Sequence, residues 1–187
     1  MRTMRRGFLG LALSLAAVAS IGTAGVAHAD HREQLTADGM RALHKLEETN
    51  HRARFLARHA KAILVFPSVL KAGFVFGGQT GNGVLFVHDR PDGYYNMTGG
   101  SWGLQLGGQD FSYALFFMTD SSLGYLHRSD GWSVGTGPSI VVVNQGAGAE
   151  ANSTTITHDV YAFPFNQKGL MADLTLQGTK ITRIHPN

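Results

Sequence analysis

A glycine–serine motif at residues 99–103 has the spacing of a catalytic nucleophile. The sequence GGSWG fits the pattern G-x-S-x-G, in which an esterase presents its serine on a tight turn between a strand and a helix. The residues that follow, Leu104-Gln105-Leu106-Gly107-Gly108, are strand-like and do not favour a helix. We therefore interpret Ser101 as part of a strand and predict no catalytic residue. A hydrolase that acts on lipid esters is kept as an alternative hypothesis for the function.

A set of histidines has spacings that could hold a metal ion. Four possible ligands fall on one face of a predicted helix: His44, Glu48, His51 and His59. Two ligands one helical turn apart can bind zinc. However, Arg41 and Arg52 fall on the same face, where they would repel a cation. The glycines at 135–137 are followed by Pro138, which does not fit a dinucleotide-binding loop. We predict neither a metal nor a cofactor.

Basic side chains are the remaining candidates for binding chemistry. Six of them are predicted to contact anionic lipid: Arg41, Lys45, Arg52, Arg58, Lys61 and Lys71. Residues 30–61 contain seven basic and five acidic residues, whereas residues 62–187 contain six and eight. A basic face on an amphipathic helix is typical of contact with anionic headgroups. The alternative is an ordinary solvated helix face.

Residues 31–60 must position most of these basic groups, and their pattern predicts an amphipathic helix, or two with a break near Asn50. The segment contains one glycine and no proline. At 100° per residue its apolar stripe is mostly alanine: Leu35, Ala42, Leu46, Ala53, Ala57 and Ala60. The opposite face carries Arg41, Lys45, Glu48, Arg52 and His59. Because alanine is too small to insert into lipid, we expect this stripe to pack on the rest of the protein.

From residue 62 onward the sequence predicts short strands separated by turns. Turn signals occur at 81–83, 91–93, 99–100 and 129–131. The predicted strands are 62–66, 73–77, 83–88, 93–98, 101–109, 111–118, 132–135, 139–144, 155–163, 170–177 and 180–184. Residues 111–118 are apolar on both faces and indicate a central strand. A short helix is predicted at 120–127, capped by Thr119 or Asp120, with Leu123 and Leu126 facing inward.

The predicted fold class is therefore α+β. An N-terminal amphipathic helix, or two, packs on a glycine-rich, curved antiparallel sheet or partly closed barrel. Glycines inside the strands indicate bulges and tight bends.

Ordered motifs along residues 32–184 resemble those of the SYLF domain. They are Ala60-Lys61…Val65-Phe66-Pro67, Lys71-Ala72-Gly73-Phe74, Gly77-Gly78…Gly81-x-Gly83, Gly99-Gly100-Ser101-x-Gly103-x-Gln105-x-Gly107 and Lys168-Gly169-Leu170…Leu176-x-Gly178. Asp173 departs from the pattern, since relatives usually have glycine there, and this could change a local bulge. The resemblance implies binding to membrane lipids through the N-terminal part of the domain, and no known catalysis. It implies phosphoinositides as ligands in eukaryotic members; for an exported bacterial member we expect phosphatidylglycerol or cardiolipin.

Residues 1–29 have the parts of a secretory signal peptide. Three arginines and no acid precede an apolar run, and Ala27-His28-Ala29 forms a small-x-small cleavage site. The pair Arg5-Arg6 followed by Gly-Phe-Leu resembles the twin-arginine export signal; a general secretory signal and an uncleaved anchor are the alternatives. We expect residues 30–187 to form a single SYLF-like domain, helical over 30–61 and mainly β over 62–187. It would reside in the periplasm or be secreted, at the membrane surface.

The export assignment also removes the excess of positive charge. Of 16 basic and 13 acidic residues, the leader contains three basic residues and no acidic ones, so residues 30–187 are formally neutral. This balance does not indicate nucleic acid as a partner. The chain has no cysteine, which excludes disulfides and a lipid-modified N-terminal cysteine. The expected function is non-catalytic binding of anionic phospholipids; the alternative is a structural or stress-response role in the periplasm with a protein or envelope partner.

Replacing Arg5 and Arg6 by lysine tests the export route. The twin-arginine pathway reads the arginine pair itself, so we expect the double variant to stay in the cytoplasm as an uncleaved precursor. Immunoblotting of cytoplasmic and periplasmic fractions measures this. Normal export of the variant would contradict the twin-arginine assignment and leave a general secretory signal.

Overall fold

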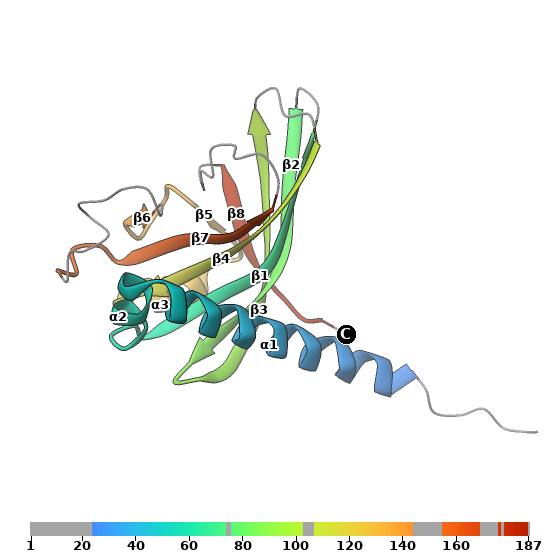
Figure 1. Cartoon of the computed structure of the whole chain (residues 1–187), viewed down its shortest axis with the longest axis horizontal. Coiled ribbons are helices and arrows are strands. Elements are labelled where there is room, and N and C mark those ends of the chain that lie inside the picture. The colour runs from blue at the N-terminus through green and yellow to red at the C-terminus, as the bar shows by residue number, and fades with distance from the viewer. Residues whose placement is uncertain are drawn as a thin grey trace, which may run out of the picture.

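A computed structural model describes residues 24–73, 76–102, 107–143, 155–168, 176 and 178–186 (Figure 1). Two helices come first along the chain, α1 (Ala24–Thr49) and α2 (His51–Ala57). Four long strands follow: β1 (Ala62–Gly73), β2 (Phe76–Val87), β3 (Arg90–Trp102) and β4 (Gly107–Phe117). The remaining elements are α3 (Asp120–Arg128), β5 (Trp132–Ser133), β6 (Ile140–Val142), β7 (Val160–Lys168) and β8 (Thr179–Ile184).

The strands form one curled sheet in the order β5-β8-β3-β2-β1-β4-β7-β6 (Figure 1). Neighbouring strands are antiparallel except β6 and β7, which are parallel. The predicted α+β class with helices on a curved sheet is confirmed, and the sheet is mixed because of that one pair. Residues from β8 and from β7, which are far apart in the strand order, belong to the same hydrophobic core. The sheet therefore curls around this core.

Strand β4 separates the two hydrophobic cores of the molecule. Phe111, Tyr113, Leu115 and Phe117 face the inner core, which α3 and β5 complete with Leu126 and Trp132. Ala114 and Phe116 face the outer core, where α1 and α2 pack. Every residue from 111 to 118 is buried. The prediction of a central strand, apolar on both faces, is confirmed.

The helical segment breaks at Asn50, as the sequence predicts. Asn50 has extended backbone angles (φ −130°, ψ 109°), and its side chain accepts a hydrogen bond from the Ala53 amide at 3.0 Å. It therefore caps α2. Ala42, Leu46 and Ala53 of the predicted alanine-rich stripe are buried against the sheet.

Glycine positions explain the main errors in the predicted strand boundaries. Residues 81–83 and 99–100, predicted as turns, lie inside β2 and β3, and the β2–β3 turn is at His88–Asp89, both with positive φ. A Cβ at Gly83 would lie 2.6 Å from the Phe66 ring. Phe66 and Pro67 form a bulge in β1 opposite Gly83, so glycine is needed there for the strands to pack.

The boundaries of other predicted strands also differ from those in the structure. Of residues 73–77, predicted as one strand, Gly73 ends β1 and Phe76 begins β2, and residues 74–75 lie outside the described residues. The strand predicted at 155–163 begins only at Val160, because residues 155–159 form a loop that packs beside α2. The strand predicted at 170–177 lies outside the described residues, as does Asp173, apart from Leu176, which is buried in the inner core.

Helix α3 matches its prediction closely. Thr119 is the N-cap, and its hydroxyl accepts a hydrogen bond from the Ser122 amide at 3.1 Å. Leu126 is buried and Leu123 packs against the inner core. Asp159 joins this cap to β6: its carboxylate accepts hydrogen bonds from the Ser139 amide (3.0 Å) and hydroxyl (2.8 Å), and from Thr119 Oγ1 (3.3 Å). The hydrogen bonds from Ser139 lower the pKa of Asp159.

Gly39 sets the distance between α1 and the sheet. A Cβ at this position would lie 2.5 Å from Cγ1 of Val84, a buried β-branched side chain that has little freedom to move. We expect Gly39→Ala to destabilise the protein by about 1–3 kcal/mol, although alanine favours a helix. Chemical denaturation measures this change. Gly124→Ala in α3 is the control, because the nearest atom there is the flexible end of Arg128; equal effects of both variants would contradict the packing argument.

Asp159→Asn tests the link between α3 and β6. The folded-state pKa of Asp159 is lowered, so its contribution to stability is present above the unfolded pKa of about 4 and is lost as the pH falls through the folded value. We expect Asn to lower the melting temperature at pH 7, and the difference from wild type to shrink below pH 4. A difference that is independent of pH would show that the carboxylate charge is not responsible.

Candidate functional site

The structure divides the six predicted lipid-binding residues into two groups. Arg41, Lys45, Arg58 and Lys61 are exposed, as a headgroup contact requires. Arg52 and Lys71 are buried, with exposed fractions of 6% and 4%. This burial excludes the two residues from an open headgroup surface, and their predicted contact with lipid stays a prediction.

Arg52 is buried because the helix break changes the orientation of the residues that follow it. The sequence prediction placed residues 31–60 on one continuous helical wheel, which put Arg52 beside Arg41 and Lys45. The extended conformation of Asn50 ends α1 and starts α2 in a new direction. Arg52 then points toward β7 and the loop before it, and its Nη2 donates a hydrogen bond to the Thr155 carbonyl oxygen at 2.9 Å.

Lys71 lies in a polar part of the sheet. Its strand partner in β2 is Gln79, also buried, whose amide donates a hydrogen bond to Thr179 Oγ1 of β8 at 2.8 Å. Pairing with β2 and β4 fixes Lys71 in the middle of the sheet. Lys71 is thus a structural residue of the sheet and not an exposed cation.

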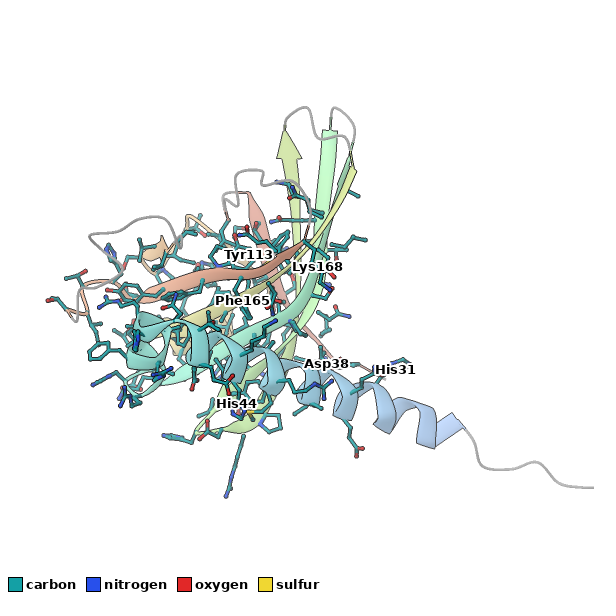
Figure 2. All side chains as sticks on the ribbon, viewed as in Figure 1. His31, Asp38, His44, Tyr113, Phe165 and Lys168 are labelled. Atoms are coloured by element: carbon teal, nitrogen blue, oxygen red, sulfur yellow. The ribbon has the colours of Figure 1, made fainter. Side chains whose placement is uncertain are left out.

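Arg41 and Lys45 line a shallow groove between α1 and the bulge of β1, here called the helix groove. Its volume is about 310 Å³, and its described lining residues are Asp38, Arg41, Ala42, Lys45, Pro67, Ser68 and Asn166. The β1 bulge places Pro67 and Ser68 there, and a left-handed backbone conformation at Asn166 (φ 53°) brings in β7. Figure 2 shows Asp38 on the part of α1 that contributes to this groove.

Acidic neighbours partly neutralise the exposed cations. Arg41 forms an ion pair with Asp38, and Lys61 lies 3.5 Å from Asp120. Lys45 and Arg58 form no salt bridge with any residue that the structure describes. Exposed ion pairs are weak, about 0–1 kcal/mol, so a lipid phosphate could replace the carboxylate partner.

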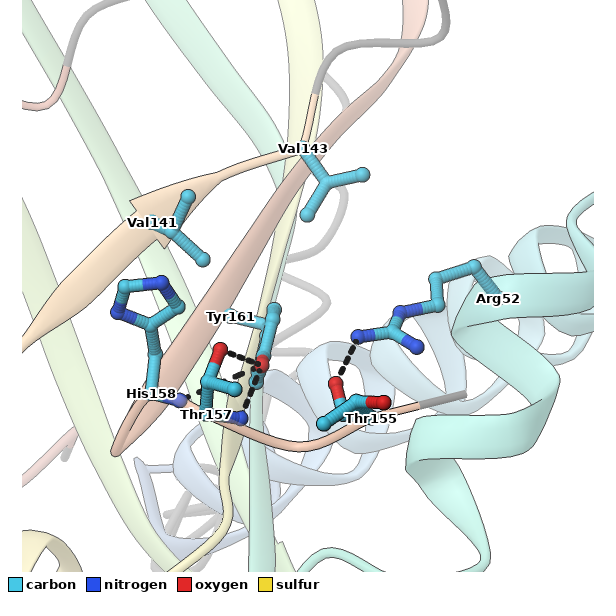
Figure 3. Close-up of a pocket in the computed structure, with 7 residues that line it drawn as sticks. All are labelled: Arg52, Val141, Val143, Thr155, Thr157, His158 and Tyr161. Carbon is cyan, nitrogen blue, oxygen red and sulfur yellow. Dashed lines mark hydrogen bonds between the residues drawn. The ribbon is translucent and has the colours of Figure 1, made fainter. Parts of the chain in front are cut away.

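A second, more enclosed site surrounds Arg52 (Figure 3). This Arg52 pocket has a volume of about 140 Å³ and is lined by Arg52, Val141, Val143, Thr155, Thr157, His158 and Tyr161. Val141 and Val143 lie on one side of it, in or next to β6, and Arg52 approaches from α2 on the other. None of these lining residues is acidic.

The guanidinium of Arg52 has aromatic neighbours and few hydrogen bonds. It lies 5.2 Å from the centre of the Tyr161 ring and 5.8 Å from that of Phe55. Its Nε and Nη1 are buried and have no hydrogen-bond partner within the described ranges. Cation–π contact stabilises such a group by up to about 2 kcal/mol. A buried charge with two unpaired donors still carries a large desolvation cost.

Tyr161 holds the loop that lines the pocket. Its hydroxyl oxygen accepts hydrogen bonds from the backbone amides of Thr157 (2.9 Å) and His158 (3.3 Å). The His158 ring packs edge-on against the Tyr161 ring. Burial alone would raise the pKa of the Tyr161 phenol. The hydrogen bonds from Thr157 and His158, together with the nearby Arg52 charge, outweigh burial and lower that pKa.

The other predicted chemical motifs form no comparable site. His44, His51 and His59 are exposed, and the described residues contain no cluster of three metal ligands. Strand β3 runs through 99–102, which agrees with the interpretation of Ser101 as a strand residue. Asp159 directly precedes β7, and its carboxylate accepts hydrogen bonds from the amide and the hydroxyl of Ser139.

Sequence reasoning did not find the Arg52 pocket. Its residues come from α2, β6 and the loop before β7, and nothing in their spacing predicts that they meet. The one available signal was Asn50, a good helix N-cap, because a new helix after Asn50 invalidates the single helical wheel on which Arg52 was placed.

Comparison with known proteins matches the C-terminal half of the chain to a family. The family model described as Ysc84, Las17-binding protein actin regulator, matches residues 98–185, from the end of β3 to the residue after β8. No curated protein matches the chain. The match includes every described lining residue of the Arg52 pocket except Arg52 itself. Together with the ordered glycine motifs, it shows that the chain belongs to the SYLF-domain family, a binding-domain family linked to lipid binding and to actin regulation.

Proposed function

We propose that this protein is a non-catalytic lipid-binding protein of the bacterial cell envelope. It contacts anionic phospholipid headgroups through Arg41 and Lys45 of the helix groove and through Arg58 and Lys61 at the junction of α2 and β1. The observation that carries this proposal is the exposure of these four cations on the helical segment. The family's link to lipid binding supports it.

The magnitudes fit a peripheral, salt-sensitive association. A basic residue near an anionic leaflet contributes about 1 kcal/mol. Four such residues would contribute about 4 kcal/mol, reduced by the carboxylates of Asp38 and Asp120 that lie beside two of them. Because the apolar stripe of α1 is buried, the described side chains of this helix present no large apolar face for deep insertion. Of the helices described, none has an apolar stretch of the length needed to cross a bilayer.

The proposed location follows from the sequence of residues 1–29. Export by the twin-arginine route and cleavage after Ala29 would leave Asp30 as the new N-terminus, within α1. Arg32 Nε donates a hydrogen bond to the Pro186 carbonyl oxygen at 2.6 Å. This contact would hold the beginning of the shortened helix against the end of the chain.

A protein partner in the envelope is the second candidate function. The matching family model is described by its binding to another protein, Las17, and by actin regulation. In this alternative the exposed cations of α1 and α2 would contact an acidic protein surface and not lipid. Vesicles of pure lipid distinguish the two candidates, because they contain no protein.

Two double variants test the proposal and separate the two cation pairs. We expect Arg41→Gln/Lys45→Gln and Arg58→Gln/Lys61→Gln each to lower affinity for vesicles containing phosphatidylglycerol by about 10-fold or more, because each removes about 2 kcal/mol of attraction. Flotation and titration with vesicles at low salt measure this affinity. Phosphatidylcholine vesicles should bind neither variant nor wild type strongly.

The matched control removes two exposed cations from elsewhere on the protein. Arg90→Gln/Arg128→Gln changes the net charge by the same amount, but the residues lie in β3 and α3. We expect it to bind anionic vesicles like wild type. An equal loss in all three variants would indicate attraction by net charge alone, and no loss in any of them would contradict the proposed surface.

A further inference from the structure

The Arg52 pocket contains a buried positive charge that the described part of the protein does not neutralise. Arg52 is 6% exposed, and its only hydrogen bond within the described ranges goes to the neutral carbonyl of Thr155. Nε and Nη1 are unpaired. Buried charges in proteins are normally paired with an opposite charge or fully hydrogen-bonded. A bound anion would supply the opposite charge.

The space beside Arg52 has the size and lining for a small anion. Its volume of about 140 Å³ exceeds that of a water molecule, about 30 Å³, several times. Thr155, Thr157, His158 and Tyr161 line it with hydroxyl and imidazole groups, while Val141 and Val143 are apolar (Figure 3). Planar guanidinium with nearby hydroxyl donors is the arrangement that recognises phosphate oxygens.

Tyr161 contributes to the proposed anion site in two ways. Its ring lies beside the guanidinium and restricts how Arg52 can move. Its hydroxyl oxygen already accepts two amide hydrogen bonds, so its own proton remains available to donate toward Thr157 or toward a ligand. The lowered pKa of this phenol makes it a stronger donor.

We propose that the Arg52 pocket binds a phosphate group, with Arg52 as its charge partner and Thr157 and Tyr161 as hydroxyl donors. The phosphate can be free inorganic phosphate or part of a phospholipid headgroup, whose first carbons would contact Val141 and Val143. This pocket shares no residue with the exposed cations of the membrane proposal. The two proposals can therefore fail independently.

Calorimetric titration of the exported protein with three probes tests this site. The probes are inorganic phosphate, dihexanoyl phosphatidylglycerol below its micelle concentration, and hexyl glucoside, which has an apolar chain but no phosphate. We expect saturable binding of at least one phosphate probe and none of hexyl glucoside. Binding of phosphate alone identifies the free ion as the source, and binding of the phospholipid alone identifies a headgroup.

Arg52→Met is the decisive variant. Methionine fills a similar volume without charge, so affinity for the phosphate probe should fall at least about 10-fold, since hydrogen bonds to charged groups are strong. The melting temperature without ligand should stay the same or rise, because an unneutralised buried charge has been removed. Arg54→Met is the matched control: its guanidinium donates to the Glu47 and Glu48 carbonyl oxygens, outside the pocket, and we expect unchanged affinity.

Thr157→Val tests the same proposal if Arg52→Met does not fold. It removes one hydroxyl from the pocket at constant volume, and we expect a several-fold loss of affinity with little change in melting temperature. The proposal is overturned if wild type binds neither phosphate probe at probe concentrations that would saturate a site with a millimolar Kd. It is also overturned if Arg52→Met binds the phosphate probe like wild type.

Discussion

Burial of both faces of β4 is the constraint on which the rest of this structure depends. A strand with apolar side chains on both faces needs cover on each side, and the protein supplies it from different parts of the chain. The sheet curls so that α3, β5 and the opposite strands cover the inner face. The two N-terminal helices cover the outer face. The position of α2 beside β7, and hence of Arg52 beside Tyr161, follows from this second requirement.

Much of the architecture could be predicted from local patterns. The helix break at Asn50, the cap at Thr119 and the double-faced strand at 111–118 each depend on a few neighbouring residues, and all three are observed. The failures depend on contacts between distant residues. Gly81 and Gly83 suggest a turn when read alone, but they lie within β2 because Val69 and Phe66 pack against them. Arg52 looked solvent-exposed because its burial depends on Thr155 and Tyr161, more than a hundred residues away.

The two proposals divide the binding chemistry between two kinds of site. The exposed cations of the helical segment suit a diffuse, screened attraction to many headgroups at once. The Arg52 pocket is small and enclosed, and suits a single group held by directed hydrogen bonds. The family match covers the end of β3, the elements from β4 to β8 and most of the pocket lining. Every exposed cation in the membrane proposal, and Arg52, belongs to the segment before the match. In both proposals, therefore, the charge comes from the segment before the match, and the matched region supplies the rest of the Arg52 pocket.

The end of β7 has a consequence for how copies of this protein behave at high concentration. Within the described residues, strand β6 pairs with residues 160–162, so the rest of β7 has an edge that β6 does not cover. That stretch contains Pro164, which has no amide hydrogen to donate, and Asn166, whose left-handed backbone interrupts the regular strand and accompanies a shift in register against β4. An additional strand would find an irregular row of donors and acceptors there. The same irregularity that brings Asn166 to the helix groove therefore also makes this edge a poor template for aggregation.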